Sequence, residues 1–153
     1  MHIRMVAFIA LAGVAFAALP VCRAENPALP VCRAENPALH RVSRIHVATM
    51  GSGDQADRFQ SLLREELGKV GFEVSEQGAN ADALLTGTFS YESGGDRTFA
   101  RATVTLKSPN GKQILWSGDY VSQHRGQGRE DVVQTVAGNC AQQLRKSWEK
   151  SGP

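Results

Sequence analysis

Residues 98–121, TFARATVTLKSPNGKQILWSGDYV, decide the fold. Along residues 98–107 apolar and polar side chains alternate, which is the pattern of a strand with one buried face. The sequence SPNG at 108–111 follows, and its Asn-Gly pair tolerates the positive φ angles of a tight hairpin turn. Residues 113–121 then return as a second strand. The face of this second strand that is predicted to be buried carries Ile114, Trp116 and Tyr120.

The segments on either side of this hairpin predict the rest of an α+β fold. The sequence ALLTGTFSY at 83–91 predicts a strand that joins the hairpin through a turn at 93–96, which gives an antiparallel meander. Apolar periodicity predicts four further elements, namely strand 42–50, helix 55–70, strand 72–74 and helix 130–150. The predicted order is β-α-β-β-β-β-α, in one mixed sheet of about five strands with both helices packed on one face.

The face of the sheet away from the helices is predicted to remain in contact with solvent. In the strand at 98–107 the side chains expected there are Arg101, Thr103, Thr105 and Lys107. A polar sheet face that no helix covers can contact a partner protein, and an uncovered sheet edge can accept an extra strand. We therefore predict that these four residues form a partner-binding face.

The first 24 residues are typical of a signal peptide. Arg4 supplies a basic start, and residues 5–18 (MVAFIALAGVAFAA) form an uncharged apolar run. This run is shorter than the about 20 residues that a membrane-spanning helix needs, and it fits the apolar region of a signal peptide. Cleavage before Glu25 or before Ala18 agrees with the small residues that precede each site. The chain is thus predicted to be exported, as a periplasmic or secreted protein.

Lipidation of Cys22 is a third processing route. Leu19 and Cys22 match two positions of a lipoprotein signal, whereas Pro20 and Val21 differ from the small residues that are usual between them. An acyl chain on Cys22 would anchor the protein to a membrane, and without this chain no membrane contact is expected.

An internal duplication separates the signal peptide from the folded region. Residues 20–29 and 30–39 are identical copies of PVCRAENPAL. Each copy has two prolines and no periodic apolar face, so residues 25–41 are predicted to form a flexible linker. A single α+β domain is predicted to follow at 42–150.

The charge balance argues against a nucleic-acid partner. The chain has 17 Lys and Arg residues against 15 Asp and Glu residues. Arg4 and Arg23 fall within the predicted signal peptide, which holds no acidic residue, so the processed chain carries no net formal charge. A protein that neutralises phosphates needs a basic surface, and the composition does not provide one.

Reactive side chains do not form a pattern that indicates catalysis or metal binding. Cys140 lies in the apolar stripe of the second predicted helix, where a buried and inert thiol is expected. Cys32 in the linker leaves three outcomes open: a disulfide with Cys140, a cross-link between two chains, or no disulfide. His40, His46 and His124 lack a second His or Cys at metal-ligand spacing. We therefore predict no catalytic residue, no metal ligand and no cofactor.

The sequence Gly51-Ser52-Gly53 lies between a predicted strand and a predicted helix, where phosphate-binding loops occur. Ser52 or Asp54 can instead cap the helix, and the carboxylates of Asp54 and Asp57 would repel a phosphate. A capping turn is the main prediction. A nucleotide- or phosphometabolite-binding site at Gly51, Ser52 and Gly53 is the alternative.

Several short stretches resemble a group of small bacterial envelope proteins. They are KVGFEV at 69–74, ADALLTGTFSY at 81–91 and PNGKQILWSGDY at 109–120, followed by an amphipathic helix. The group includes the curli-secretion lipoprotein, the penicillin-binding-protein activator lipoproteins and the amino-terminal domain of the Tol-system translocation protein. The resemblance spans residues 42–150 and implies a non-enzymatic accessory domain. We therefore expect an exported binding or assembly module of the cell envelope, with an envelope protein as its partner.

Overall fold

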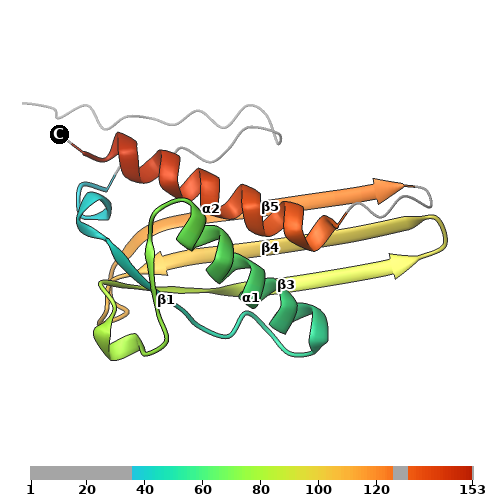
Figure 1. Ribbon diagram of the computed structural model, residues 1–153, viewed down its shortest axis with the longest axis horizontal. Coiled ribbons are helices and arrows are strands. Elements are labelled where there is room, and N and C mark those ends of the chain that lie inside the picture. The colour runs from blue at the N-terminus through green and yellow to red at the C-terminus, as the bar shows by residue number, and fades with distance from the viewer. Residues whose placement is uncertain (1–35, 126–130, 153) are drawn as a thin grey trace, which may run out of the picture. The chain divides into compact units, whose positions relative to one another are not determined.

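The computed structural model describes residues 36–125 and 131–152. Along the chain the elements are η1 (Leu39–Arg41), β1 (Arg44–Val47), α1 (Asp54–Lys69), β2 (Glu73–Ser75), η2 (Gly78–Asn80), β3 (Ala83–Gly94), β4 (Arg97–Lys107), β5 (Ile114–Arg125) and α2 (Val132–Lys150). Figure 1 shows that α1 and α2 lie side by side on one face of the sheet. The predicted α+β fold with its element order is confirmed.

The sheet is mixed and has the strand order β2-β1-β3-β4-β5. β1 pairs in parallel with both β2 and β3, while β3, β4 and β5 form the antiparallel meander that the sequence predicts. The strand-helix-strand unit β1-α1-β2 explains the parallel pair, because parallel neighbours need a crossover connection. β3, β4 and β5 continue past the helices at one end, where the turn between β3 and β4 forms the tip (Figure 1).

The core lies between the helices and the sheet. One apolar stripe on each helix supplies it, as the helical periodicity predicts. Fully buried helix residues include Phe59, Leu63, Leu67, Val136, Cys140 and Leu144. Fully buried strand residues include Ile45, Val47, Leu85, Val104 and Leu106. Each large apolar side chain removed from water contributes roughly 1.5–3 kcal/mol, so these stripes hold the helices on the sheet.

The folded region begins earlier than the sequence predicts. Leu39 is only 3% exposed and joins the core, although it lies within the predicted linker 25–41. The indole Nε1 of Trp148 donates a hydrogen bond to the carbonyl oxygen of Val42 at 2.8 Å. The ring of His40 stacks on Trp148 with 4.7 Å between centroids. These contacts attach residues 36–41 to the carboxyl end of α2.

β5 differs from its prediction in orientation and in length. A bulge opposite Leu106 and Lys107 shifts the register, so Ile114 is 59% exposed. Leu115 and Trp116 are buried instead, and the predicted inward orientation of Ile114 is therefore wrong. The strand also runs to Arg125, four residues beyond its predicted end at 121. Its polar end pairs with β4 throughout, because a cross-strand partner supplies hydrogen bonds that the local sequence does not indicate.

No helix among the described residues is long and apolar enough to span a membrane. The predicted signal peptide at 1–24, most of the duplication and the residues Cys22 and Cys32 lie outside the described residues. Cys140 is fully buried in the core, as the sequence predicts.

Candidate partner-binding face

The outer sheet face is the surface of β3, β4 and β5 that points away from α1 and α2. Ala100, Ala102 and Val104 of β4 are buried beneath the helices, so the alternate residues of that strand point outward. The register places them in rows that cross the strands, and three of these rows carry the predicted residues Arg101, Thr103 and Thr105. The rows are Thr86–Thr105–Ser117, Thr88–Thr103–Asp119 and Ser90–Arg101–Val121. The middle of the face therefore consists of short hydroxyl side chains and Val121 around one pair of opposite charges. Two further rows, Glu92–Phe99–Gln123 and Gly94–Arg97–Arg125, continue the face toward the turn between β3 and β4.

Asp119 links two of the predicted face residues. The Arg101 guanidinium donates from Nε to Asp119 Oδ1 at 3.2 Å and from Nη2 to Asp119 Oδ2 at 2.6 Å. The Thr103 hydroxyl donates to Asp119 Oδ1 at 3.1 Å. The ion pair is bidentate, a geometry that orients the guanidinium plane across the strands.

The Arg101–Asp119 pair is about half exposed, with 52% of the Arg101 side chain and 48% of the Asp119 side chain accessible. The hydrogen bond from Arg101 lowers the pKa of Asp119, with smaller help from Thr103 and from the Arg101 charge. The same contact raises the pKa of Arg101. Both groups therefore stay charged across the physiological pH range. An exposed pair of this kind adds little stability, and its value lies in offering fixed donors and acceptors to a partner.

The structure joins only part of the predicted set of four. Arg101 and Thr103 meet at Asp119, whereas Thr105 is half-buried and its carbonyl oxygen accepts a long hydrogen bond from the Thr86 hydroxyl at 3.4 Å. Lys107 is the last residue of β4, beside the bulge, and lies away from the charged cluster. Sequence reasoning missed Asp119. The register that places Asp119 opposite Thr103 depends on the bulge, which no local motif in the sequence marks.

The loop at Gly51–Gly53 is a helix start. Gly53 is the N-cap of α1 with φ of 97°, and no side chain caps this helix, so the predicted cap by Ser52 or Asp54 is wrong. Gly51 also has a positive φ, of 138°, which favours glycine. Asp54 and Asp57 occupy the first turn, where their negative charges interact favourably with the helix dipole and repel an anion. No basic side chain lies in this turn to favour the predicted anion site.

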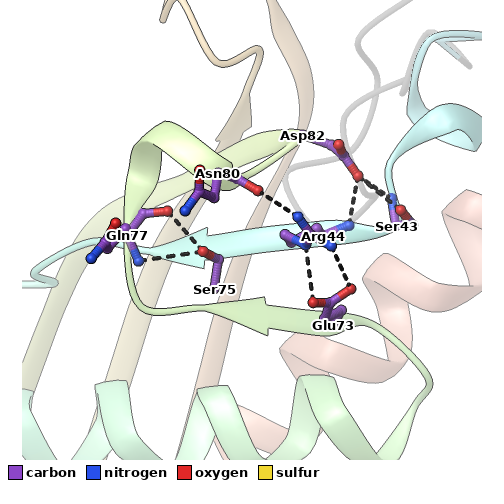
Figure 2. A network of polar contacts seen from close by, with 7 residues as sticks. All are labelled: Ser43, Arg44, Glu73, Ser75, Gln77, Asn80 and Asp82. Carbon is purple, nitrogen blue, oxygen red and sulfur yellow. Dashed lines mark hydrogen bonds and ion pairs between the residues drawn. The ribbon is translucent and has the colours of Figure 1, made fainter.

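A second polar network lies at the parallel strands, between β1, β2 and the start of β3 (Figure 2). The Asp82 carboxylate accepts hydrogen bonds from the backbone N–H of Arg44 at 2.8 Å, the Ser43 hydroxyl at 2.8 Å and the Ser43 N–H at 3.1 Å. These contacts, led by the Arg44 N–H, lower the pKa of Asp82. Arg44 in turn pairs with Glu73 at 3.0 Å and donates to the carbonyl oxygen of Asn80 at 3.2 Å. The network ties β1 to β2 and to the start of β3.

Neither polar cluster has the composition of a catalytic site. Within residues 36–125 and 131–152 no group of three His, Cys, Asp or Glu residues is placed to hold a metal ion. Asp119 and Asp82 are each held by donors that keep them ionised, which disfavours the role of general acid or base near neutral pH. The chemistry that the outer sheet face offers is hydrogen bonding and charge pairing.

Comparison with solved structures shows the fold of the chain. The PelC dodecamer from Paraburkholderia phytofirmans shares 18% identity with a TM-score of 0.57, over 72% of this chain and 92% of that chain. A minor lipoprotein from Acinetobacter baumannii shares 13% identity with a TM-score of 0.50, over 72% and 96%. Lipoprotein GNA1162 from Neisseria meningitidis shares 13% identity with a TM-score of 0.50, over 68% and 99%.

At these identities the likeness is one of fold. It does not distinguish among the three particular groups that the sequence resembles. No family model matches the chain, and no curated protein matches it either.

Proposed function

We propose that the chain is an exported, non-enzymatic assembly module of the bacterial cell envelope that binds a protein partner through its outer sheet face. The observation that carries the proposal is the Arg101–Asp119–Thr103 cluster, which is half exposed on a sheet face that neither helix covers. The cluster has fixed polar groups, and such groups give a protein interface its specificity and register.

Export is supported by the amino-terminal sequence and by the names of solved proteins that have the same fold. The apolar run at 5–18 has the length of the apolar region of a signal peptide, and two of the structures that share the fold are named as lipoproteins. Cleavage before Glu25 or Ala18 would release a periplasmic or secreted protein, whereas acylation of Cys22 would anchor the domain to a membrane.

An assembly role is supported by the kind of surface that the domain presents. The PelC structure, which shares this fold, is described as a dodecamer, so the fold is compatible with multi-subunit assemblies. The outer sheet face combines hydroxyl groups, which accept or donate, with one oriented ion pair. The Gly51–Gly53 loop carries no second proposal, because Asp54 and Asp57 oppose an anion there.

The proposal is tested in two steps. The intact mass and the first residue of the protein from its natural host report which processing route is used; an unprocessed chain in the cytosol would contradict export. Capture from envelope extracts then compares the wild-type chain with Arg101→Glu. The proposal expects a specific envelope partner that Arg101→Glu loses and that Gln142→Ala, on the exposed side of α2, retains. Equal capture by both variants would contradict a role for the outer sheet face.

A further inference from the structure

β5 forms one edge of the sheet. Within residues 36–125 and 131–152 it has one strand neighbour, β4. It is 12 residues long and contains neither proline nor lysine, the residues that commonly protect an exposed edge. The Asn36 side-chain amide donates to the carbonyl oxygen of Ile114 at 3.2 Å, which marks the start of this edge. A long edge of this kind is a template for pairing with another strand.

Apolar exposure is concentrated on the same strand. Ile114 is 59% exposed and Val121 is 52% exposed, and both belong to β5. Val121 lies in the middle of the strand, on the outer sheet face and opposite Arg101. An exposed β-branched residue at the centre of an edge strand gains from a neighbouring strand that covers it.

The charges at the end of β5 are also incomplete within one copy of the chain. Arg97 and Arg125 are direct cross-strand partners, and like charges in such positions destabilise the pairing. Neither side chain forms an ion pair with a carboxylate of the described residues. Asp119 lies on the same face of β5 as Arg125 because an even number of positions separates them. The strand therefore carries at its middle a carboxylate that already pairs with Arg101 and is 48% exposed, and a basic group at its end.

An antiparallel second copy of β5 matches the open edge, the exposed Val121 and the charge pattern. With the twofold axis at Val121, each Val121 faces Val121 of the second copy, and each Arg125 faces Ser117. The next residue on the same face after Ser117 is Asp119, which is then a diagonal neighbour of Arg125. Diagonal neighbours lie within reach of long side chains. The same strand thus supplies both halves of a self-complementary interface, as twofold symmetry requires.

We propose that β5 pairs antiparallel with β5 of a second copy of this chain, so that two sheets join into one. The interface buries the two Val121 side chains and places each Arg125 guanidinium beside the Asp119 carboxylate of the other copy. It uses the edge of the sheet and leaves the opposite, helix-covered face unchanged. The inference does not rest on export, because its partner is the chain itself.

The oligomeric state of the full chain tests the pairing. Sedimentation velocity at tens of micromolar protein, with a reducing agent present, is expected to detect a dimer. Val121→Lys and Arg125→Asp should each raise the dimer dissociation constant by at least about tenfold, since each removes about 1.4 kcal/mol or more of interface energy. Ser90→Lys, an exposed substitution on the same face but on β3, should leave the constant unchanged. A monomer throughout, or a dimer that neither β5 variant weakens, would overturn the proposal.

Cysteine cross-linking tests the register. In a Cys22→Ser, Cys32→Ser background, Val121→Cys places two thiols across the twofold axis, at the cross-strand spacing that a disulfide can bridge. Mild oxidation should therefore link Val121→Cys into a covalent dimer. Ser117→Cys, which faces Arg125 in this register, should remain unlinked. A link through Ser117→Cys with none through Val121→Cys would refute the register, and no link from either would refute the pairing.

Discussion

The two edge strands of the sheet, β2 and β5, differ in length and in the groups that lie beside them. At the β2 edge the strand has only three residues, and side chains complete the hydrogen bonding where β2 stops. The carbonyl oxygen of Val47 accepts from Gln60 Nε2 at 3.0 Å and from Arg64 Nη2 at 3.1 Å, both on α1. At the β5 edge the strand is four times as long, and its exposed groups include Val121 and Arg125.

This difference separates stability from recognition. The parallel side of the sheet is held by polar side chains that connect neighbouring elements. Replacing these side chains with alanine should therefore destabilise the fold. The meander is held by long backbone ladders and by the core beneath it, so substitutions of its outward polar groups should change binding and leave the fold intact. The predictions below follow this division, from the largest expected effect to the smallest.

The largest effect is expected inside the meander, where backbones approach closely. A Cβ at Gly87 would overlap the carbonyl oxygen of Thr103 and lie 3.0 Å from the Cα of Val104. Backbone atoms cannot move aside without breaking the ladder, so Gly87→Ala should cost about 3 kcal/mol of unfolding free energy. Gly94→Ala, on the same strand β3, is the matched control, because a Cβ there would meet nothing within 4 Å. Urea unfolding measures both, and equal costs would contradict this account.

On the parallel side, Asp82→Ala should cost about 2 kcal/mol. The substitution removes an acceptor that serves two backbone N–H groups and the Ser43 hydroxyl, and hydrogen bonds to a charged group contribute about 1.5–3 kcal/mol. Glu76→Ala, an exposed carboxylate in the neighbouring loop, should change stability by less than about 0.5 kcal/mol. Thermal unfolding of the two variants gives the comparison. A cost for Asp82→Ala no greater than that for Glu76→Ala would show that the network in Figure 2 does not hold the edge.

Acid should weaken both sides of the sheet. The folded-state pKa values of Asp82 and Asp119 lie below the usual carboxyl value of 3.8. Their stabilising effect is therefore complete above that value and is lost as pH falls through the folded-state values. The wild-type chain should lose more unfolding free energy between about pH 5 and pH 3 than the double variant Asp82→Asn, Asp119→Asn. Parallel pH profiles for the two proteins would contradict the assignment.

The smallest effect on stability is expected at the outer sheet face. Arg101→Ala removes an exposed ion pair that water and salt screen, so the unfolding free energy should hardly change. Arg44→Ala, which breaks an ion pair and a contact to the Asn80 carbonyl on the parallel side, should cost more. Chemical denaturation measures the unfolding free energy of both variants. A larger loss for Arg101→Ala than for Arg44→Ala would contradict the view that polar side chains stabilise the parallel side more than the meander.

The sequence predicts the fold class and the element order because periodicity reports burial directly. The alternation at 98–107 and the apolar stripe of α1 each identify a buried face, and both predictions agree with the structure. The parallel pair of β1 and β2 also follows from the sequence, since a strand, a helix and a strand in succession favour it.

The remaining features depend on contacts that are distant in sequence. Ile114 was predicted to face the core, but a bulge of one residue gives that place to Leu115. Leu39 was predicted to lie in a linker, and it is buried because Trp148, far along the chain, holds the neighbouring backbone. Asp119 was missed at the candidate site for the same reason as Ile114, since its partner is set by the register after the bulge.

The attachment of η1 to the carboxyl end of α2 also sets how the domain can be oriented. Leu39 and Trp148 fix the point where the described chain starts, at the end of the molecule opposite to the turn between β3 and β4 (Figure 1). An attachment close to Asn36 would hold this end and leave the turn between β3 and β4 pointing away from it. In a pair joined through antiparallel β5 strands, the two ends that carry η1 would lie at opposite extremes of the pair. Such a pair would lie flat along a support or bridge two of them, and would not stand upright on one.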